Sequence, residues 1–522
     1  MEQIEIVIGL LAGVAVLAAI AERAGLPHAA VLVLGGLVLG LIPDVPQVRL
    51  DPQLVLLGLL PPLVYAAAFQ AASYDLRSNL ANILTLATGL VLITVVAVAA
   101  VGRALTGLPW VSALVLGALS APTDPVSASS VLRGVGAPER IVAILEGESL
   151  INDGTGLAAF QVEVAAAAGG ISIGAGLLKF VEISVGGCAV GLVAGWLLVR
   201  LRRRLDEPSL EIVLGLLAAF GSYVAAYGLG WSGVLAAVTA GLYAGSQAEE
   251  ISSPGARLNT EPFWNALTFV LESILFLLIG LQLPTIASGL SGHVATGIGD
   301  GIVLVAVVVA VRAAWMTALR PAQRLGRGRR DGDPLSGREL TVLGFSGMRG
   351  ALSLAGALSI PLVVSGHPFA GRDEVIFLVY VIVIGTLVPP SLTLEAVVRR
   401  LGLATGDKLL RQEVEARERI VHAGLARLDE LAQETAVPEP TLDRLRAVLE
   451  LRLERVEARR RRLGEAPAEA LDVDHAVQRL RREVIDAERS ALAELRRQRR
   501  VPTQVLARIQ RDIDLDEVRL GR

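Results

Sequence analysis

The stretch Ser120-Ala-Pro-Thr-Asp-Pro-Val126 lies in the middle of an apolar run that extends over residues 108–132. Pro122 and Pro125 each remove a backbone donor and disrupt a helix, and Asp124 is a good N-cap for a helix that begins again at Pro125. The apolar pieces before and after this stretch are each shorter than the roughly 20 residues needed to cross a bilayer. The stretch therefore predicts one membrane-spanning helix that is broken near its middle.

A helix broken at that depth leaves carbonyl groups unpaired on one side of the break and amide groups unpaired on the other. Irregular backbone inside a membrane is tolerated only where it lines a cavity or is buried in protein. We therefore expect Thr123 and Asp124 to lie at a polar site within a bundle of helices.

The chain on both sides of this break has the composition of a polytopic membrane protein. Of its 522 residues, 53% are hydrophobic and 19% are charged, and its mean hydropathy is +0.58. These values exclude an ordinary soluble protein, and the single cysteine, Cys188, excludes a disulfide framework and a zinc site of ordinary spacing. We expect an all-α fold with about thirteen transmembrane helices. Their expected ranges are 4–22, 28–46, 53–72, 80–102, 108–132, 138–168, 174–200, 209–228, 231–247, 262–284, 294–319, 339–364 and 374–398.

A second polar segment, Glu146-Gly-Glu-Ser-Leu-Ile-Asn-Asp-Gly-Thr-Gly156, lies in the sixth expected span. On a helix, Ser149 and Asp153 are four residues apart and share a face. Glu148 and Asn152 share a neighbouring face for the same reason. A hydroxyl and a carboxylate that converge form an oxygen-rich, partly anionic site of the kind that hard cations prefer. A turn at Asn-Asp-Gly would leave two pieces too short to cross, so we expect continuous helix here.

Proton chemistry in the core is expected to depend on a carboxylate. The five histidines all lie in loops, at the ends of expected spans or in the C-terminal tail: His28, His293, His367, His422 and His475. Burial in a low-dielectric region favours the neutral form of a carboxyl group, and a bound cation favours its charged form. One buried Asp that holds either a cation or a proton is then sufficient for exchange. Asp153 and Asp124 are the candidate ligands for a monovalent cation.

Two arginines and a further carboxylate are also embedded in apolar runs. Gly347-Met-Arg-Gly350 lies in the twelfth expected span, and Arg349 needs a counter-charge at that depth. We expect Glu148 to be its partner in a structural ion pair. Arg312, in the eleventh span, is most simply interpreted as structural, and Glu272, in the tenth, has no partner that the sequence assigns.

The distribution of arginines predicts an orientation. Placing the N-terminus outside leaves only Arg49, Arg103 and Arg372 in outer loops. Fifteen arginines then fall in cytoplasmic loops, as the positive-inside rule requires: Arg23, Arg77, Arg133, Arg140, Arg200, Arg202, Arg203, Arg204, Arg257, Arg320, Arg324, Arg327, Arg329, Arg330 and Arg338. The same orientation places the C-terminus in the cytoplasm.

Two domains are expected, a transmembrane domain over residues 1–400 and a cytoplasmic helical tail over residues 401–522. In the tail, apolar residues recur at three- and four-residue steps from Leu442 to Val456, which is typical of an amphipathic helix. The pattern leaves open whether the tail is a solvated appendage or a module that regulates the protein or stabilises a dimer.

Together these segments resemble a known family. Thr123-Asp124-Pro125, Glu148-Ser-Leu-Ile-Asn-Asp153 and Gly347-Met-Arg-Gly350 are similar to motifs of the cation:proton antiporters of the NhaP-type and eukaryotic sodium/proton exchanger group. The resemblance covers residues 1–400, and Leu480–Arg489 in the tail resembles the bacterial sodium/proton exchanger branch. Further similar segments are Pro61-Pro62, Trp231-Ser-Gly-Val-Leu235, Phe263-Trp264 and Leu275-Phe-Leu-Leu-Ile-Gly280.

The resemblance implies an inverted-repeat fold of thirteen helices, two of them broken and crossing near the midplane, and a homodimer. It implies that Asp153 binds the cation and the proton with help from Asp124 and Ser149, and that Glu148 pairs with Arg349. An Asn at the position of Asn152 goes with electroneutral exchange in such relatives. This sequence departs from them in one respect, because Pro61-Pro-Leu-Val-Tyr-Ala-Ala-Ala68 lacks the acidic residue that many relatives carry in the third span.

The sequence therefore predicts a Na⁺/H⁺ antiporter of the cell membrane, with a role in pH homeostasis and sodium tolerance. It is expected to be no enzyme, to need no cofactor and to bind no nucleic acid. A K⁺/H⁺ antiporter and a sodium-coupled solute symporter remain alternatives. An intramembrane aspartyl protease is excluded, because Asp75 falls in an expected cytoplasmic loop and Asp300 at an outer span end, about 30 Å of hydrocarbon apart.

Overall fold

A computed structural model describes most of the chain, which divides into two compact units, Met1–Ala404 and Thr405–Arg522. The residues that the structure does not describe include Asp75 and all but two residues of Leu480–Arg489. The described residues are 2–43, 54–71, 83–169, 173–205, 207–251, 254–288, 290, 294–325, 335–404, 406–434, 438–463 and single residues between 487 and 510.

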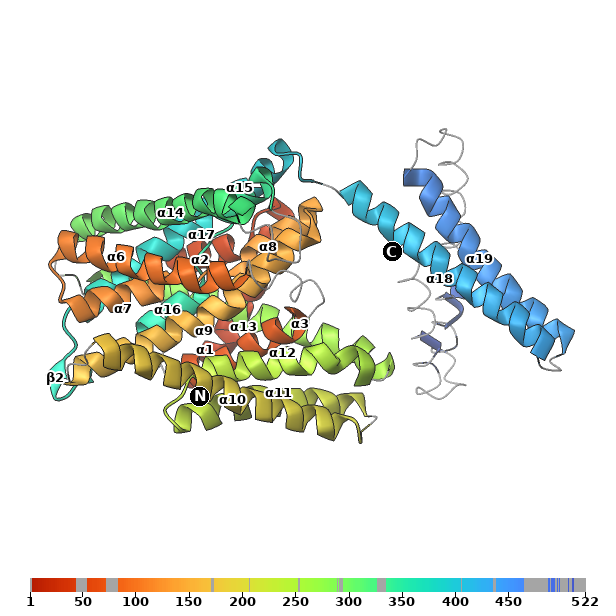
Figure 1. Cartoon of the computed structure of the whole chain (residues 1–522), viewed down its shortest axis with the longest axis horizontal. Coiled ribbons are helices and arrows are strands. Elements are labelled where there is room, and N and C mark those ends of the chain that lie inside the picture. The colour runs from red at the N-terminus through yellow and green to blue at the C-terminus, as the bar shows by residue number, and fades with distance from the viewer. Residues whose placement is uncertain are drawn as a thin grey trace. The chain divides into compact units, whose positions relative to one another are not determined.

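The described elements of the first half of unit 1 are all helices (Figure 1). Two π-helical turns, η1 and η2, lead into α3 and α6. The elements are α1 (Glu2–Ala24), α2 (His28–Gly40), η1 (Leu54–Leu59), α3 (Leu60–Ala71), η2 (Thr85–Leu90), α6 (Val91–Thr106), α7 (Trp110–Ser120), α8 (Pro125–Val135) and α9 (Glu139–Gly169).

The second half of unit 1 adds further helices and one short hairpin, in which Val364 pairs with His367. Its elements are α10 (Ile173–Arg202), α11 (Pro208–Gly228), α12 (Gly233–Ile251), α13 (Pro254–Ser288), α14 (Val294–Leu325), α15 (Gly337–Phe345), α16 (Ala351–Leu358), β1 (Val363–Val364), β2 (His367–Pro368) and α17 (Arg372–Arg400).

These helices fall in order on the ranges expected from the sequence, and the all-α membrane fold is confirmed. Within the described residues, seven helices are long and apolar enough to cross a membrane. The 31-residue helix α9 runs without interruption through Asn152-Asp153-Gly154, because apolar residues on both sides favour helix over a turn. The number of helices that actually cross the membrane stays a prediction.

The helices of unit 1 pack mainly within two sets. One set contains α1, α2, α3, α10, α11, α12 and α13, with α2 packed along α13 and α12 along both α3 and α10. The other contains α6, α7, α8, α14, α15, α16 and α17, with α6 packed on α7 and α14 on α17. Figure 1 shows α14, α6 and α7 on one side of α9 and α10, α11 and α12 on the other. Helix α9 thus lies between the two sets.

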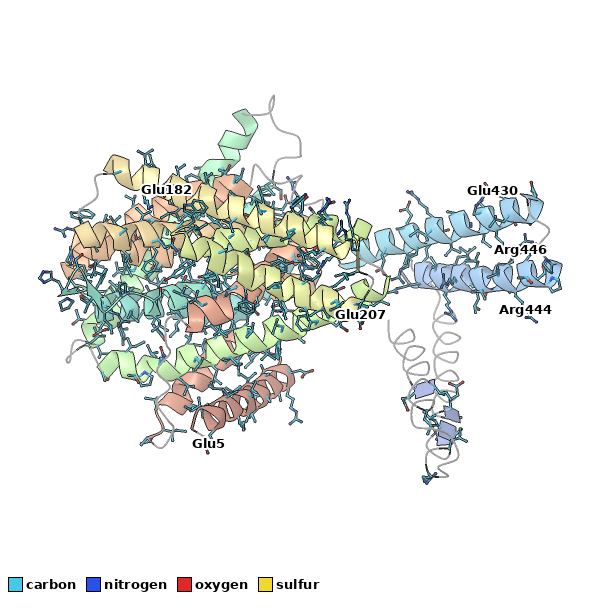
Figure 2. All side chains as sticks on the ribbon, turned by 90° about the horizontal axis from the view of Figure 1, so that it is seen from below. Glu5, Glu182, Glu207, Glu430, Arg444 and Arg446 are labelled. Atoms are coloured by element: carbon cyan, nitrogen blue, oxygen red, sulfur yellow. The ribbon has the colours of Figure 1, made fainter. Side chains whose placement is uncertain are left out.

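Unit 2 contains an antiparallel pair of helices, α18 (Gly406–Glu434) and α19 (Glu439–Leu463). Ion pairs join Arg446 to Asp429 and Arg460 to Glu418, so residues farther along α19 meet residues nearer the start of α18. Figure 2 labels Glu430, Arg444 and Arg446 on this pair. The amphipathic segment expected in the tail falls on α19.

Close packing of α2 on α13 depends on glycine. A Cβ added to Gly280 would overlap the backbone carbonyl of Val33, and one added to Gly36 would overlap the carbonyl of Leu277. Helix association in a membrane relies on such close backbone contact, since burial from water does not drive it.

We expect Gly280→Ala to lower the thermal stability of the purified protein, because the new methyl group must push α2 and α13 apart. Overpacking of this kind costs about 1–3 kcal/mol. Gly299→Ala on α14 is the matched control, since a Cβ there meets no atom within 4 Å. Equal melting temperatures for the two variants, measured in the same detergent, would contradict the prediction.

Candidate ion-binding site

Two interrupted helices meet at the centre of unit 1. Helix α7 ends at Ser120 and α8 begins at Pro125, as the two prolines predicted. Helix α15 ends at Phe345 and α16 begins at Ala351. The backbone N–H of Asp124 donates a 2.8 Å hydrogen bond to the carbonyl of Met348. The two breaks therefore contact each other directly, and each satisfies a backbone group that the other leaves unpaired.

Arg349 lies in the second break and binds the end of the first broken helix. Its Nε donates a 3.1 Å hydrogen bond to the carbonyl of Ser120, the last residue of α7, and its Nη1 donates to the carbonyl of Gly347. Only 1% of Arg349 is exposed. The C-terminal end of a helix carries partial negative charge, so the guanidinium stabilises this buried end.

Glu148 is paired with Arg312 and not with Arg349, so the partner expected from the sequence is wrong. Arg312 Nη1 and Nη2 lie 2.5 and 2.9 Å from the two carboxylate oxygens of Glu148, a bidentate arrangement with both residues 1% exposed. Arg312 also donates through Nε and Nη2 to the carbonyl of Leu343, in the last turn of α15. Arg349 donates hydrogen bonds at the C-terminal end of α7, and Arg312 does the same at the C-terminal end of α15.

Two glycines make these contacts sterically feasible, and their roles were missed from the sequence. A Cβ on Gly347 would overlap the Arg312 side chain, and a Cβ on Gly350 would overlap the Asp124 carboxyl group. The signal was present, because glycines on both sides of a buried arginine are typical of close backbone approach.

Thr123 is held in place by three side chains of α9. Asn152 Nδ2 donates a 2.7 Å hydrogen bond to Thr123 Oγ1, which lies 3.4 Å from a carboxylate oxygen of Glu148. The Ser149 hydroxyl donates a 2.6 Å bond to the Thr123 carbonyl. Ser149 Oγ is also 3.5 Å from Asp153 Oδ2, which agrees with the shared helix face expected for these two residues. The cluster fixes the first break against α9.

A cavity of about 750 Å³ opens onto this cluster. Its lining includes Thr123, Asp124, Ser149 and Asp153, together with Glu272 from α13. Four other candidates from the sequence, Asn152, Glu148, Arg312 and Arg349, are absent from that lining. These four are buried behind the first group, where they hold the breaks in place.

The composition of the cavity suits a small monovalent cation. Asp153, Asp124 and the Ser149 hydroxyl supply hard oxygen atoms, the donors that alkali cations prefer. Among the residues that the structure describes, no three His, Cys, Asp or Glu side chains are close enough to hold one metal ion together. The rest of the coordination would therefore come from hydroxyl, carbonyl and water oxygens.

At its other end the cavity reaches polar residues near helix termini. Arg133, close to the end of α8, pairs at 2.8 Å with Glu146 near the start of α9, and both line the cavity. Gln70, near the end of α3, lines it as well and donates a 3.1 Å hydrogen bond to Asn265 on α13. The side chain of Arg133 is 53% exposed, so this end is the mouth of the cavity.

Comparison with known proteins identifies the family. The profile of the transmembrane domain of sodium/hydrogen exchangers matches residues 10–400. The chain belongs to the sodium/hydrogen exchanger family. The resemblance seen in the motifs is thereby confirmed, and the protein is a multi-pass membrane transporter and not an enzyme.

Individual relatives agree with this assignment. The Na⁺/H⁺ antiporter ApNhaP of Aphanothece halophytica is 35% identical over 436 residues, which cover 82% of this chain and 80% of the relative. An uncharacterised Na⁺/H⁺ exchanger of Mycobacterium tuberculosis is 32% identical over 537 residues, covering 99% of this chain and 96% of that protein. The solved structure of the sodium proton antiporter MjNhaP1 from Methanocaldococcus jannaschii is similar in fold, with a TM-score of 0.61 at 19% identity. That match covers 77% of this chain and 99% of MjNhaP1.

We expect Glu148→Ala and Arg312→Ala each to reduce the amount of folded protein in the membrane, because either change leaves a buried charge uncompensated. Breaking a buried pair costs about 3–5 kcal/mol. The double variant should recover part of this loss, as fluorescence-detected size exclusion would show.

The matched control for this cycle combines Glu148→Ala with Arg349→Ala. These two residues are bound to different groups, so the double variant should be no better folded than either single variant. Recovery with Arg349 instead of Arg312 would contradict the assignment of the pair.

Proposed function

We propose that this protein is a secondary active antiporter that exchanges Na⁺ for H⁺ across the cytoplasmic membrane, with both ions competing for Asp153. The observation that carries the proposal is the placement of Asp153 on the cavity, beside the Ser149 hydroxyl and facing the broken helix that bears Asp124. The antiporter activity named for ApNhaP supports the same assignment.

The charges behind the cavity leave the Asp153 carboxylate available. Glu148 and Arg312 neutralise each other, and Arg349 is bound to carbonyl groups. Asp153 is paired with no arginine or lysine among the described residues, so its charge is balanced either by a proton or by a cation that enters the cavity. Suppose that the protein moves Asp153 from one side of the membrane to the other only while Asp153 holds a proton or a cation. The two ions are then exchanged.

Asp124 is the second acidic residue of the proposed site. Its carboxyl group lies against Gly350, which precedes α16, and Asp124 itself precedes α8. Helix N-termini carry partial positive charge, so the ends of two half-helices stabilise this carboxylate. We assign Asp124 the role of adding negative electrostatic potential to the cavity, while the two helix N-termini stabilise its charged form.

The proposed orientation makes the mouth of the cavity cytoplasmic. Arg133 lies at this mouth, and the asymmetry of the arginines places the loop that follows it inside the cell. In this conformation Asp153 would then be reached from the cytoplasm. Movement of one helix set against the other, with α9 between them, would open the path to the opposite side.

A homodimer is part of the proposal, on the strength of the family resemblance. Helices α1 and α10 expose large apolar side chains, among them Ile8, Val16, Leu178 and Val193, each more than half exposed. Lipid or a second protomer would cover these surfaces.

A K⁺/H⁺ antiporter of the same fold is a second candidate function. The apolar side chains that α3 contributes to the cavity favour it. Leu60, Leu63, Val64 and Ala67 line the cavity there and supply no oxygen ligand from their side chains. With fewer fixed ligands, a site discriminates less against the larger cation. Adding Na⁺, K⁺ and Li⁺ in turn to everted vesicles and following proton flux separates the two.

Asp153→Asn should abolish cation-driven proton flux in everted vesicles while leaving folded protein in the membrane, because the nearly isosteric change removes only the titrating group. Asp124→Asn should impair flux less completely. Asp300→Asn on α14 is the control, since Asp300 does not line the cavity and the variant should retain wild-type flux. Substantial flux in the Asp153 variant would refute the assignment.

Competition at one carboxylate predicts a specific pH dependence. The apparent cation affinity should weaken about tenfold for each pH unit below the pKa of that carboxylate, because a proton and a cation exclude each other. The maximal rate at saturating cation should change much less. Exchange by purified protein in proteoliposomes, measured at several pH values, distinguishes the two parameters.

The same vesicles test electroneutrality, which we propose because Asn152 precedes Asp153 and adds no second titratable group. A membrane potential set with potassium and valinomycin should leave the rate unchanged. One net charge per cycle would instead be affected by about 2.3 kcal/mol per 100 mV. A rate that follows the potential would show that a second group carries a proton.

A further inference from the structure

Glu272 is a carboxylate that the exchange chemistry described above does not use. It lies in the middle of α13, lines the cavity that contains Asp124 and Asp153, and belongs to the opposite helix set from Asp124. Its carboxyl group makes no hydrogen bond or ion pair within the part of the chain that the structure describes. A charged side chain at this depth without a partner costs about 2.5–3.5 kcal/mol even on lenient scales. Such residues therefore point to a ligand.

The surrounding wall explains why one carboxylate on α13 matters. Helix α3 contributes only apolar side chains to the deep part of the cavity, because the third span lacks an acidic residue. The two helices are adjacent, since Gln70 bonds to Asn265 and the rings of Tyr65 and Trp264 lie 5.3 Å apart. Glu272 is thus the acidic residue that this side of the cavity presents at depth.

The position of Glu272 relative to α3 can be derived from helix geometry. Glu272 is seven residues, or two turns, from Asn265, and Leu63 is seven residues from Gln70. The expected third and tenth spans run in opposite directions, so both steps lead from the mouth into the cavity by about 10 Å. Leu63 and Glu272 therefore lie at similar depth, on neighbouring helices that line the same space.

Electrostatics connect Glu272 to the proposed site without direct coordination. Its carboxyl group lines the same cavity as Asp124 and Asp153. The described residues nevertheless contain no three carboxylates that could hold one bare ion. Charges in a cavity with low-dielectric walls are weakly screened, and such clefts concentrate counter-ions. Glu272 is consequently placed to attract a cation that still carries part of its hydration shell.

We propose that Glu272 is a loading residue, which holds a hydrated monovalent cation in the cavity before the cation reaches Asp153 and Asp124. This inference rests on the proposed antiport function and assigns a specific step of it. Glu272 belongs to the helix set that faces the broken helices, so it would act in the conformation in which the cavity is open at its Arg133 end.

The test measures the KM for Na⁺ and the kcat of proton-coupled exchange for Glu272→Gln in proteoliposomes. We expect the KM to rise about tenfold, because the cavity loses one weakly screened charge, and kcat to change by less than about twofold. Glu261→Gln provides a graded comparison, since Glu261 is on the same helix three turns nearer the mouth and is exposed. Its charge is screened by solvent, so its KM should rise less than about twofold.

Relocating the charge gives a second, independent readout. Leu63→Glu in the Glu272→Gln background returns a carboxylate to similar depth on α3, and we expect it to lower the KM again toward the wild-type value. Leu63→Gln in the same background controls for the polar substitution and should leave the KM high.

Three outcomes would overturn the proposal. An unchanged KM for Glu272→Gln would show that the carboxylate does not act on the cation. A fall in kcat and in folded protein with the KM unchanged would assign Glu272 a structural role. A wild-type rate that follows the membrane potential, together with a Glu272→Gln rate that does not, would make Glu272 a proton carrier. Wild type and Asp153→Asn in the same assay test the antiport function itself, so its failure is seen separately.

Discussion

The ends of the two broken helices are the constraint on which the rest of this structure depends. Inside a membrane no water is available to pair with a free carbonyl or amide group, and each unpaired group costs several kcal/mol. Four such ends meet at the centre of unit 1. The carbonyl ends of α7 and α15 are each bound by a buried arginine, Arg349 and Arg312. The amide ends of α8 and α16 both adjoin the carboxyl group of Asp124.

This arrangement determines which charges remain for transport. Arg349 donates hydrogen bonds to the end of α7, and Arg312 is shared between α15 and Glu148, so both guanidinium groups are bound by groups that do not line the cavity. The Asp153 carboxylate, which lines the cavity, is therefore paired with no arginine or lysine among the described residues. A site of this kind attracts a cation or keeps a proton, and the choice between them depends on their concentrations. The proposed competition at Asp153 thus depends on the way in which the helix ends are satisfied.

The two helix sets give the site its access. One set carries the breaks, while the other supplies the facing wall from α3, α12 and α13. That wall is largely apolar and carries Glu272 as its deep carboxylate. A low-dielectric wall weakens the screening of the charges beside it. A small number of acidic residues therefore dominates the electrostatic potential in the cavity.

The sequence by itself determined the local features. The prolines on either side of Thr123-Asp124 fixed the first break, and the helical period placed Ser149 and Asp153 on one face of α9, because both effects act within a few residues. Only the tertiary structure decided the partner of Glu148, since Arg312 is 164 residues away and no period links them. It likewise decided that Arg349 binds the end of α7, and that Glu272 and Asp124 line one cavity. Buried charges are paired by proximity in the folded bundle, where glycines such as Gly347 make room for them, and that proximity depends on how helices distant in sequence pack together.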